Sequence, residues 1–102
     1  MKKLFFLLFI AIVSCDKRSK INQTAEISCG QCNFNLTAKN GCDLAVRIDN
    51  KAYFVEGFGI DDFGDAHDEH TGFCEVIRTS TIKGVLKDSV FMASSIELEN
   101  LP

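Results

Sequence analysis

Four cysteines and two histidines are the residues of this sequence whose types and spacing could do chemistry. The segment "SCGQCNF" (28–34) places Cys29 and Cys32 with two residues between them, and Cys42 and Cys74 follow along the chain. A Cys-x-x-Cys segment can act as a redox couple, form half of a metal site, or supply the ends of two different disulfides. Each alternative predicts different surroundings for the segment.

A thiolate metal site is the first alternative. Zinc is held by four thiolate or imidazole ligands, and many zinc sites begin with a Cys-x-x-Cys segment. Cys42 and Cys74, or His67 and His70, could complete the set. Thiolates are soft ligands that also suit Cu(I), so zinc and copper are the metals predicted. Because Cys42 and Cys74 are far apart in the chain, the sequence carries only half of a known zinc motif.

The first fifteen residues, "MKKLFFLLFIAIVSC", predict export. Two lysines precede an apolar run at 4–13, which is the pattern of a secretory signal. In a helix such a run rises only about 15 Å, half of a hydrocarbon core of about 30 Å. Residues 12–15 resemble the bacterial lipobox, which ends in a small residue and a cysteine. The resemblance implies cleavage before Cys15 and acylation of Cys15, which would anchor the protein firmly.

This start defines the predicted organisation of the chain. We expect a signal peptide at 1–14, a lipid-anchored tether at 15–24 and one small domain at 25–102. The protein would lie in the bacterial cell envelope, facing the periplasm and held at the membrane through its lipid anchor. An ordinary signal peptide that happens to end near a cysteine is the alternative.

Charge argues against nucleic acid as a partner. The chain has 11 Lys and Arg against 14 Asp and Glu. Cleavage of the signal peptide would remove Lys2 and Lys3 and leave nine basic residues against 14 acidic ones, which is a net charge of −5 with His neutral. Nucleic-acid binding requires a basic footprint that this balance lacks. The same balance predicts that the lipid, and not charge, holds the protein at the membrane.

Two disulfides are the second alternative for the cysteines. With Cys15 lipidated, the other four form an even set, and exported proteins meet oxidising conditions. Four cysteines allow three pairings, among which the sequence does not choose. A small domain would gain about 2–4 kcal/mol from each bridge. Gly30 would let the chain turn, so that Cys29 and Cys32 reach different partners.

A thiol-oxidoreductase is the third alternative. It requires the Cys-x-x-Cys segment at the start of a helix that follows a parallel strand, where the helix lowers the thiol pKa. The residues that follow, "NFNLTA" (33–38), alternate with period two and predict a strand instead. No strand–helix–strand unit surrounds the segment, so the sequence disfavours redox catalysis.

The acidic segment 58–72 is a second candidate metal site. Its composition of glycines, acids and two histidines predicts a loop. Asp65, His67 and His70 could converge as a carboxylate and two imidazoles, a known ligand set for divalent transition metals. The spacing of the acids is not that of an EF-hand. A solvated acidic loop that keeps the protein soluble is the alternative.

The elements that must position these residues are mostly strands. Alternation of apolar and polar residues predicts strands at 33–38, 44–48, 52–57, 81–86 and 90–98. Turn residues at 49–51 and 87–89 predict two hairpins, and apolar spacing predicts one short helix within 71–78.

This order predicts a fold that is mainly β. Three strands, a helix and a closing hairpin indicate a small five-stranded antiparallel OB-like barrel with one short helix between the third and fourth strands. Gly84 lies inside a predicted strand, where it would suit a bulge or a barrel corner. An open antiparallel sheet with one helix on its face is the alternative.

Most of the chain also resembles a known family. The matching segments are "CGQC" (29–32), residues 41–57, "GDAH" (64–67), "GFC" (72–74) and residues 82–98. Together they resemble an uncharacterised family of small exported bacterial domains. The resemblance implies a shared fold and supplies no activity.

Three functional hypotheses follow. Because no motif of a known hydrolase, metalloprotease or phosphate-binding enzyme is present, we favour a non-enzymatic binding domain, cross-linked by disulfides, for an unknown protein or small-ligand partner. The alternatives are a zinc- or copper-binding or -sensing lipoprotein that uses the CGQC cysteines, Cys29 and Cys32, and His67, and an envelope thiol-oxidoreductase.

Overall fold

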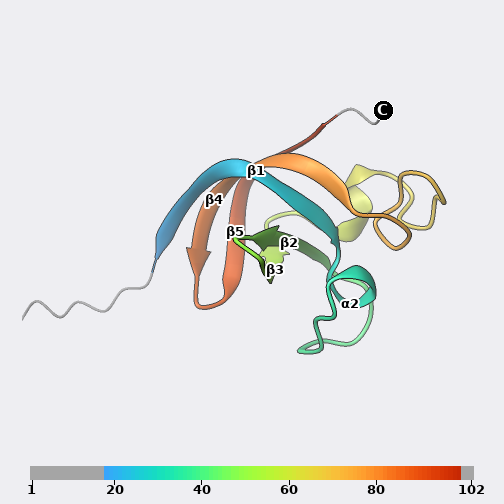
Figure 1. Cartoon of the computed structure of the whole chain (residues 1–102), viewed down its shortest axis with the longest axis horizontal. Helices are drawn as coiled ribbons and strands as arrows, with labels where there is room; N and C mark the ends of the chain where they lie inside the picture. Colours follow the sequence, from blue (N-terminus) through green and yellow to red (C-terminus); the bar gives the residue numbers. More distant parts are fainter. Residues whose placement is uncertain (1–17, 100–102) are drawn as a thin grey trace, which may run out of the picture.

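The computed structural model describes residues 18–99, in which five strands close into a barrel (Figure 1). The predicted signal peptide and the predicted lipidation site, Cys15, both lie outside these residues. The strands are β1 (Ser19–Cys29), β2 (Leu44–Ile48), β3 (Lys51–Glu56), β4 (Arg78–Lys87) and β5 (Val90–Leu98), in the spatial order β1-β2-β3-β5-β4. The described residues also form two short helices, α2 (Gly30–Asn33) and the 3₁₀-helix η2 (Ile60–Phe63). Among residues 18–99, no helix is long and apolar enough to cross a membrane.

The long strand β1 closes the barrel because it pairs with two neighbours. Its residues 19–27 pair with β4, and its last residues, 26–29, pair with β2. Both pairings are antiparallel. β1 therefore runs along the whole barrel, and its final residue is Cys29.

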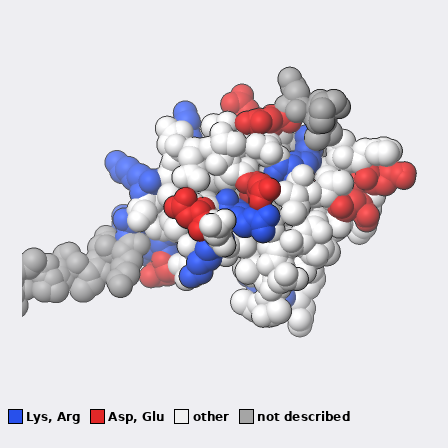
Figure 2. Space-filling view, viewed as in Figure 1, with Lys and Arg blue, Asp and Glu red and all other residues white. Residues whose placement is uncertain are grey.

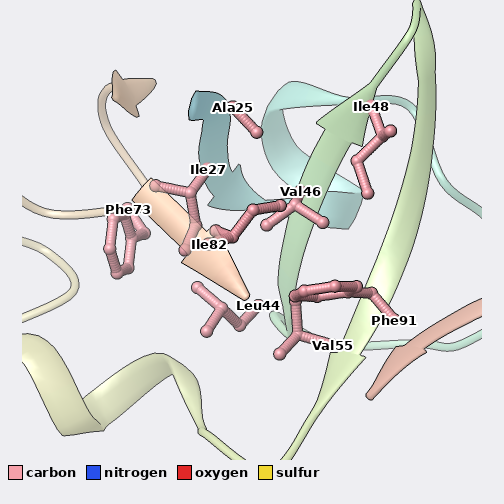
Figure 3. Packing of buried hydrophobic residues seen from close by; sticks show 9 residues of the cluster. All are labelled: Ala25, Ile27, Leu44, Val46, Ile48, Val55, Phe73, Ile82 and Phe91. Carbon is pink, nitrogen blue, oxygen red and sulfur yellow. The ribbon is translucent and has the colours of Figure 1, made fainter. Parts of the chain in front are cut away.

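The core fills the inside of this barrel (Figure 3). Ile27, Val46, Ile82 and Phe91 are completely buried. Burial of one such side chain contributes about 1.5–3 kcal/mol relative to exposure. The cluster of buried residues comprises Ala25, Ile27, Leu44, Val46, Ile48, Val55, Phe73, Ile82 and Phe91.

Both predicted hairpins are present, and their turns explain why. Asp49 and Asn50 connect β2 to β3, and both have positive φ angles, 52° and 73°. Asp88 and Ser89 connect β4 to β5 with φ angles of 53° and 68°. Two successive residues of positive φ form a turn whose twist matches that of paired strands, and Asp and Asn tolerate this conformation well.

The structure corrects the predicted strand pairing in one respect. β3 and β5 run parallel, with Val55 opposite Phe91, whereas every other pair in the barrel is antiparallel. The parallel pair arises because the segment between β3 and β4 crosses the end of the barrel before the β4–β5 hairpin returns. The predicted five-stranded barrel is confirmed, and its fully antiparallel arrangement is wrong.

The first strand is also displaced from its predicted position. Residues 33–38 do not form a strand, because Asn35 has a φ of 61° and breaks the extended backbone. The apolar Phe34 and Leu36 instead pack with Ala45 and Phe54 in a second small cluster. The first strand is β1, which begins at Ser19, so residues 19–24 belong to the barrel and not to a tether.

The helix predicted within 71–78 is a single turn. The carbonyl of Gly72 accepts hydrogen bonds from the backbone N–H groups of Glu75 (3.0 Å) and Val76 (2.9 Å), and β4 begins at Arg78. Phe73 is buried but Ile77 is 41% exposed, so the apolar residues do not form one buried helical face. The helical segment between the third and fourth strands is η2, which lies in the segment predicted as a loop.

The predicted irregularity at Gly84 is confirmed as a shift in the β4–β5 register between Lys83 and Gly84. A Cβ atom at Gly84 would lie inside van der Waals contact of the Met92 carbonyl oxygen and 2.9 Å from the Ala93 Cα atom. Both obstacles are backbone atoms of the paired strand, which cannot move without disturbing the ladder.

We predict that Gly84→Ala lowers the free energy of unfolding by about 1–3 kcal/mol, since overpacking against fixed neighbours costs energy of this order. Urea denaturation measures the change. Gly59→Ala is the matched control, because a Cβ atom there would meet its nearest neighbour, Asp62 Oδ2, at an ordinary 3.8 Å. Equal losses in the two variants would contradict the packing explanation.

Candidate metal centre

Four elements bring the four cysteines to one end of the barrel. Cys29 ends β1, Cys32 lies in α2, Cys42 lies in the loop before β2, and Cys74 lies in the turn before β4. Their sulfur atoms all lie within 4.8 Å of one another. Cys29 is completely buried and Cys32 is exposed, while Cys42 and Cys74 are half-buried. The cluster therefore reaches from the core of the barrel to its surface.

The four side chains are free thiols in contact with one another. The Sγ of Cys42 donates to the Sγ of Cys29 at 2.6 Å and lies 2.8 Å from the Sγ of Cys74. A disulfide bond joins sulfurs at about 2.05 Å. Four sulfurs around a tetrahedral zinc, each about 2.3 Å from the metal, would lie about 3.8 Å from one another. A small outward movement of the side chains would create that space.

The short helix α2 contains Gly30, Gln31 and Cys32 of the Cys-x-x-Cys segment, and the strand predicted directly after the segment, at 33–38, does not form. Cys29 caps α2, and its sulfur accepts a hydrogen bond from the backbone N–H of Cys32 at 3.4 Å. The backbone N–H of Phe34 donates to the carbonyl of Gly30 at 3.1 Å and closes the turn. The turn thus brings the sulfurs of Cys29 and Cys32 close together, and it directs the backbone N–H of Cys32 at the Cys29 sulfur.

The thiols differ strongly in acidity. Burial raises the pKa of Cys29, but hydrogen bonds from Cys42, Cys32 and Gln31 outweigh it, so the pKa lies below the ordinary value. The hydrogen bond with Cys29, burial and the Cys29 charge raise the pKa of Cys32 to about 11. Burial and hydrogen bonds with Cys29 and Cys74 raise the pKa of Cys42. Cys29 therefore ionises before Cys32 and Cys42, and its charge then opposes their ionisation unless a cation is present.

Gln31 holds the Cys42 loop against α2. Its Oε1 accepts from the backbone N–H of Asp43 at 2.8 Å, and its Nε2 donates to the Asp43 carboxylate at 2.7 Å. The backbone N–H of Gly30 donates to the carbonyl of Asp43 at 2.8 Å. Gly30 is needed for close packing and not for a turn, because a Cβ atom there would lie 2.9 Å from both Leu36 and Phe54.

Ser28 and Asn33 hold the Cys74 turn against β1. The buried Ser28 Oγ lies 2.8 Å from the carbonyl oxygen of Phe73 and 2.7 Å from that of Val76, on either side of Cys74, so its one O–H is shared between these two acceptors. The Asn33 amide donates to the Ser28 oxygen at 2.7 Å and to the Phe73 carbonyl at 3.0 Å. Neither residue was predicted from the sequence, since a serine and an asparagine beside cysteines give no local signal of such a network.

The second predicted metal site is not brought to the cysteine cluster. Asp65, His67 and His70 are exposed, and among residues 18–99 the group of metal-ligand side chains that converges is that of the four cysteines. The loop is organised by its own turns instead. The Asp68 carboxylate accepts from the backbone N–H groups of His70 and Thr71, and these bonds lower the Asp68 pKa.

The fold and the site together define a small β-barrel domain that carries a four-cysteine cluster at one end. Residues 23–99 match the Family of unknown function (DUF6370), and this match covers more than half of the chain, so the chain belongs to that family. No curated protein and no solved structure matches this chain. The family carries no assigned activity, and the function must be inferred from the site.

We predict that Ser28→Ala lowers the free energy of unfolding by about 1–3 kcal/mol, because it leaves buried polar groups of Asn33 and of the Cys74 turn without their partner. Chemical denaturation measures the loss. Ser95→Ala, at an exposed position on β5, is the control and should change stability little. A Ser28 variant as stable as the control would contradict the positioning role.

Proposed function

We propose that this domain binds one thiophilic metal ion, zinc in the first place, through Cys29, Cys32, Cys42 and Cys74. The observation that carries the proposal is the convergence of all four sulfurs within 4.8 Å of one another. Four thiolates from separate loops, opened by a Cys-x-x-Cys turn, are the usual composition of a structural zinc site. Metal binding would also hold the three loops together, and so would stabilise this end of the barrel.

The arrangement of the sulfurs favours one metal over two disulfides. Two bridges would call for two separate pairs, whereas the Cys42 sulfur lies against those of Cys29 and Cys74 at once. The buried Cys29 also receives a backbone hydrogen bond from Cys32, and such bonds stabilise a thiolate ligand.

Thiol–disulfide catalysis is less well supported. An attacking cysteine needs exposure together with a low pKa. In this cluster Cys29 has the lowered pKa but is completely buried, and Cys32 is exposed but has its pKa raised to about 11. The two properties lie on different residues.

Zinc is preferred to copper because four ligands suit a tetrahedral ion. Cu(I) is the alternative, since soft thiolates also select it. We further propose that the barrel is of the OB-like type, supported by its five strands and by a first strand shared between β2 and β4. The lipobox resemblance supports a periplasm-facing lipoprotein acylated at Cys15.

We predict that the chain purified under reducing conditions binds one zinc ion, and that Cys74→Ser reduces its affinity for zinc at least about tenfold, the lower end of the effect of losing a metal-site contact. Metal analysis and competition with a chromogenic chelator measure the stoichiometry and affinity. Bound Co²⁺ should give the absorption of a tetrahedral thiolate complex.

Two variants serve as controls for this experiment. Cys15→Ser removes a cysteine outside the cluster, and His67→Ala removes an exposed imidazole, so both should retain zinc at full affinity. If Cys74→Ser binds zinc as tightly as the unchanged chain, the four-cysteine site is refuted.

We predict that the chain expressed in a bacterial envelope begins at Cys15 and carries acyl chains, and that Cys15→Ala lacks them and leaves the membrane fraction. Intact mass and cell fractionation measure both effects. Cys32→Ala, which removes an exposed cysteine of the cluster, should keep the lipid and remain at the membrane. Unchanged membrane retention of Cys15→Ala would refute the lipid anchor.

A further inference from the structure

The net negative charge conceals a polarised distribution of charge. Figure 2 shows several Lys and Arg side chains around the end of the barrel at which β1 begins, with some Asp and Glu among them, and a group of Asp and Glu without Lys or Arg beside it at the opposite end. The acidic end includes the exposed Asp61, Asp62, Asp65, Asp68 and Glu69. The basic end includes Arg18, Lys20, Lys51, Lys83 and Lys87. The net charge of the whole chain therefore conceals the group of positive charges at the basic end.

The register of the strands places most of these cations on one outer surface. Lys20 is paired with Val85 and Asn22 with Lys83, while the alternate residues of β1, such as Ala25 and Ile27, point into the core. Lys83 and Lys87 share the outward-facing side of β4 with Val85, because side chains two residues apart in a strand point the same way. Acids also occur near these cations: Asp49 and Asp88 lie in the two hairpin turns, and Asp16 precedes Arg18 by two residues in the sequence.

Two hollows open on this basic end, each with a volume of about 220 Å³. The first is lined by Arg18, Lys87, Val85 and the 45% exposed Met92. The second is lined by Ser19, Lys51, Tyr53, Leu86, Asp88 and Ser89. Cations, hydroxyl groups and exposed apolar side chains are thus found together, and this combination suits a phosphate group attached to an apolar body.

The chain length between Cys15 and the barrel limits how far the start of β1 can lie from the bilayer. β1 begins at Ser19, only four residues after Cys15. Four residues span at most about 14 Å when fully extended. If Cys15 is acylated, as proposed above, the basic end cannot move further than this from the bilayer surface. The attraction between exposed charges acts over a Debye length of about 8 Å at physiological salt.

We propose that Arg18, Lys20, Lys83 and Lys87, with Lys51 beside them, form a docking surface for anionic phospholipid headgroups of the bilayer that holds the lipid anchor. This inference rests on the proposed lipidation of Cys15 and is independent of the metal site. It differs from the expectation, drawn from net charge, that the lipid and not charge holds the protein at the membrane. Docking orients the barrel with the cysteine cluster, at the far end of β1, directed away from the bilayer.

Flotation with lipid vesicles tests the docking surface without the anchor. The mature chain from residue 15, with Cys15→Ser, contains the whole barrel and cannot be acylated. We expect it to bind vesicles of equal parts phosphatidylglycerol and phosphatidylcholine, and not phosphatidylcholine alone. Lys83→Gln should weaken binding about fivefold, and the double variant Lys20→Gln with Lys83→Gln more than tenfold, since each basic residue near an anionic surface contributes about this factor.

Lys39→Gln is the matched control, since Lys39 is an exposed lysine in the loop that carries Cys42 and should not affect binding. Salt near 1 M, where the Debye length is about 3 Å, should abolish binding. Equal binding to neutral vesicles, or equal loss in the Lys39 and Lys83 variants, would overturn the docking surface. Failure of the lipid anchor would appear separately, as an absence of acyl chains on the unchanged protein.

Discussion

The structure of this domain depends on what happens at the end of β1. There the strand leaves the ladder and turns into α2, and the backbone N–H of Cys29 donates to the carbonyl of Phe73 at 3.1 Å. One residue later, the N–H of Gly30 donates to the carbonyl of Asp43. These two bonds place the Cys74 turn and the Cys42 loop on either side of the Cys-x-x-Cys segment. The cysteine cluster is therefore a consequence of how the barrel closes.

The same strand separates two ends of different character. β1 has 11 residues from Ser19 to Cys29, and the ten steps between them span up to about 33 Å. The basic end, near the proposed anchor, is suited to a lipid surface, while the other end carries the thiols and, beyond them, an acidic loop. With both proposals combined, the barrel would separate the metal site from the membrane.

Features that depend on local chemistry could be predicted from the sequence. Both hairpins followed from turn residues, at Asp49-Asn50 and Asp88-Ser89, and the bulge followed from a glycine inside a strand. β1 could not be predicted in the same way. Its outward residues are polar, and it is held by a ladder with β4 that forms between residues far apart in the sequence.

The candidate site could be predicted only in part, because it also depends on contacts between residues far apart in the sequence. The four cysteines were identified by type, but their convergence depends on non-local closure of the barrel. The helix α2 has only four residues, too few to show a helical period, and it forms because Cys29 caps it. The role of Ser28 follows from contacts with residues 45 and 48 positions away.

The mass of the intact protein, taken from the envelope and measured under non-denaturing conditions, tests the four-cysteine metal site most directly. We expect a chain with four reduced cluster cysteines and the added mass of one metal ion, which is lost on treatment with a chelator. A metal-free chain that is lighter by four hydrogens would show two disulfides in place of the metal site and would contradict the proposed function.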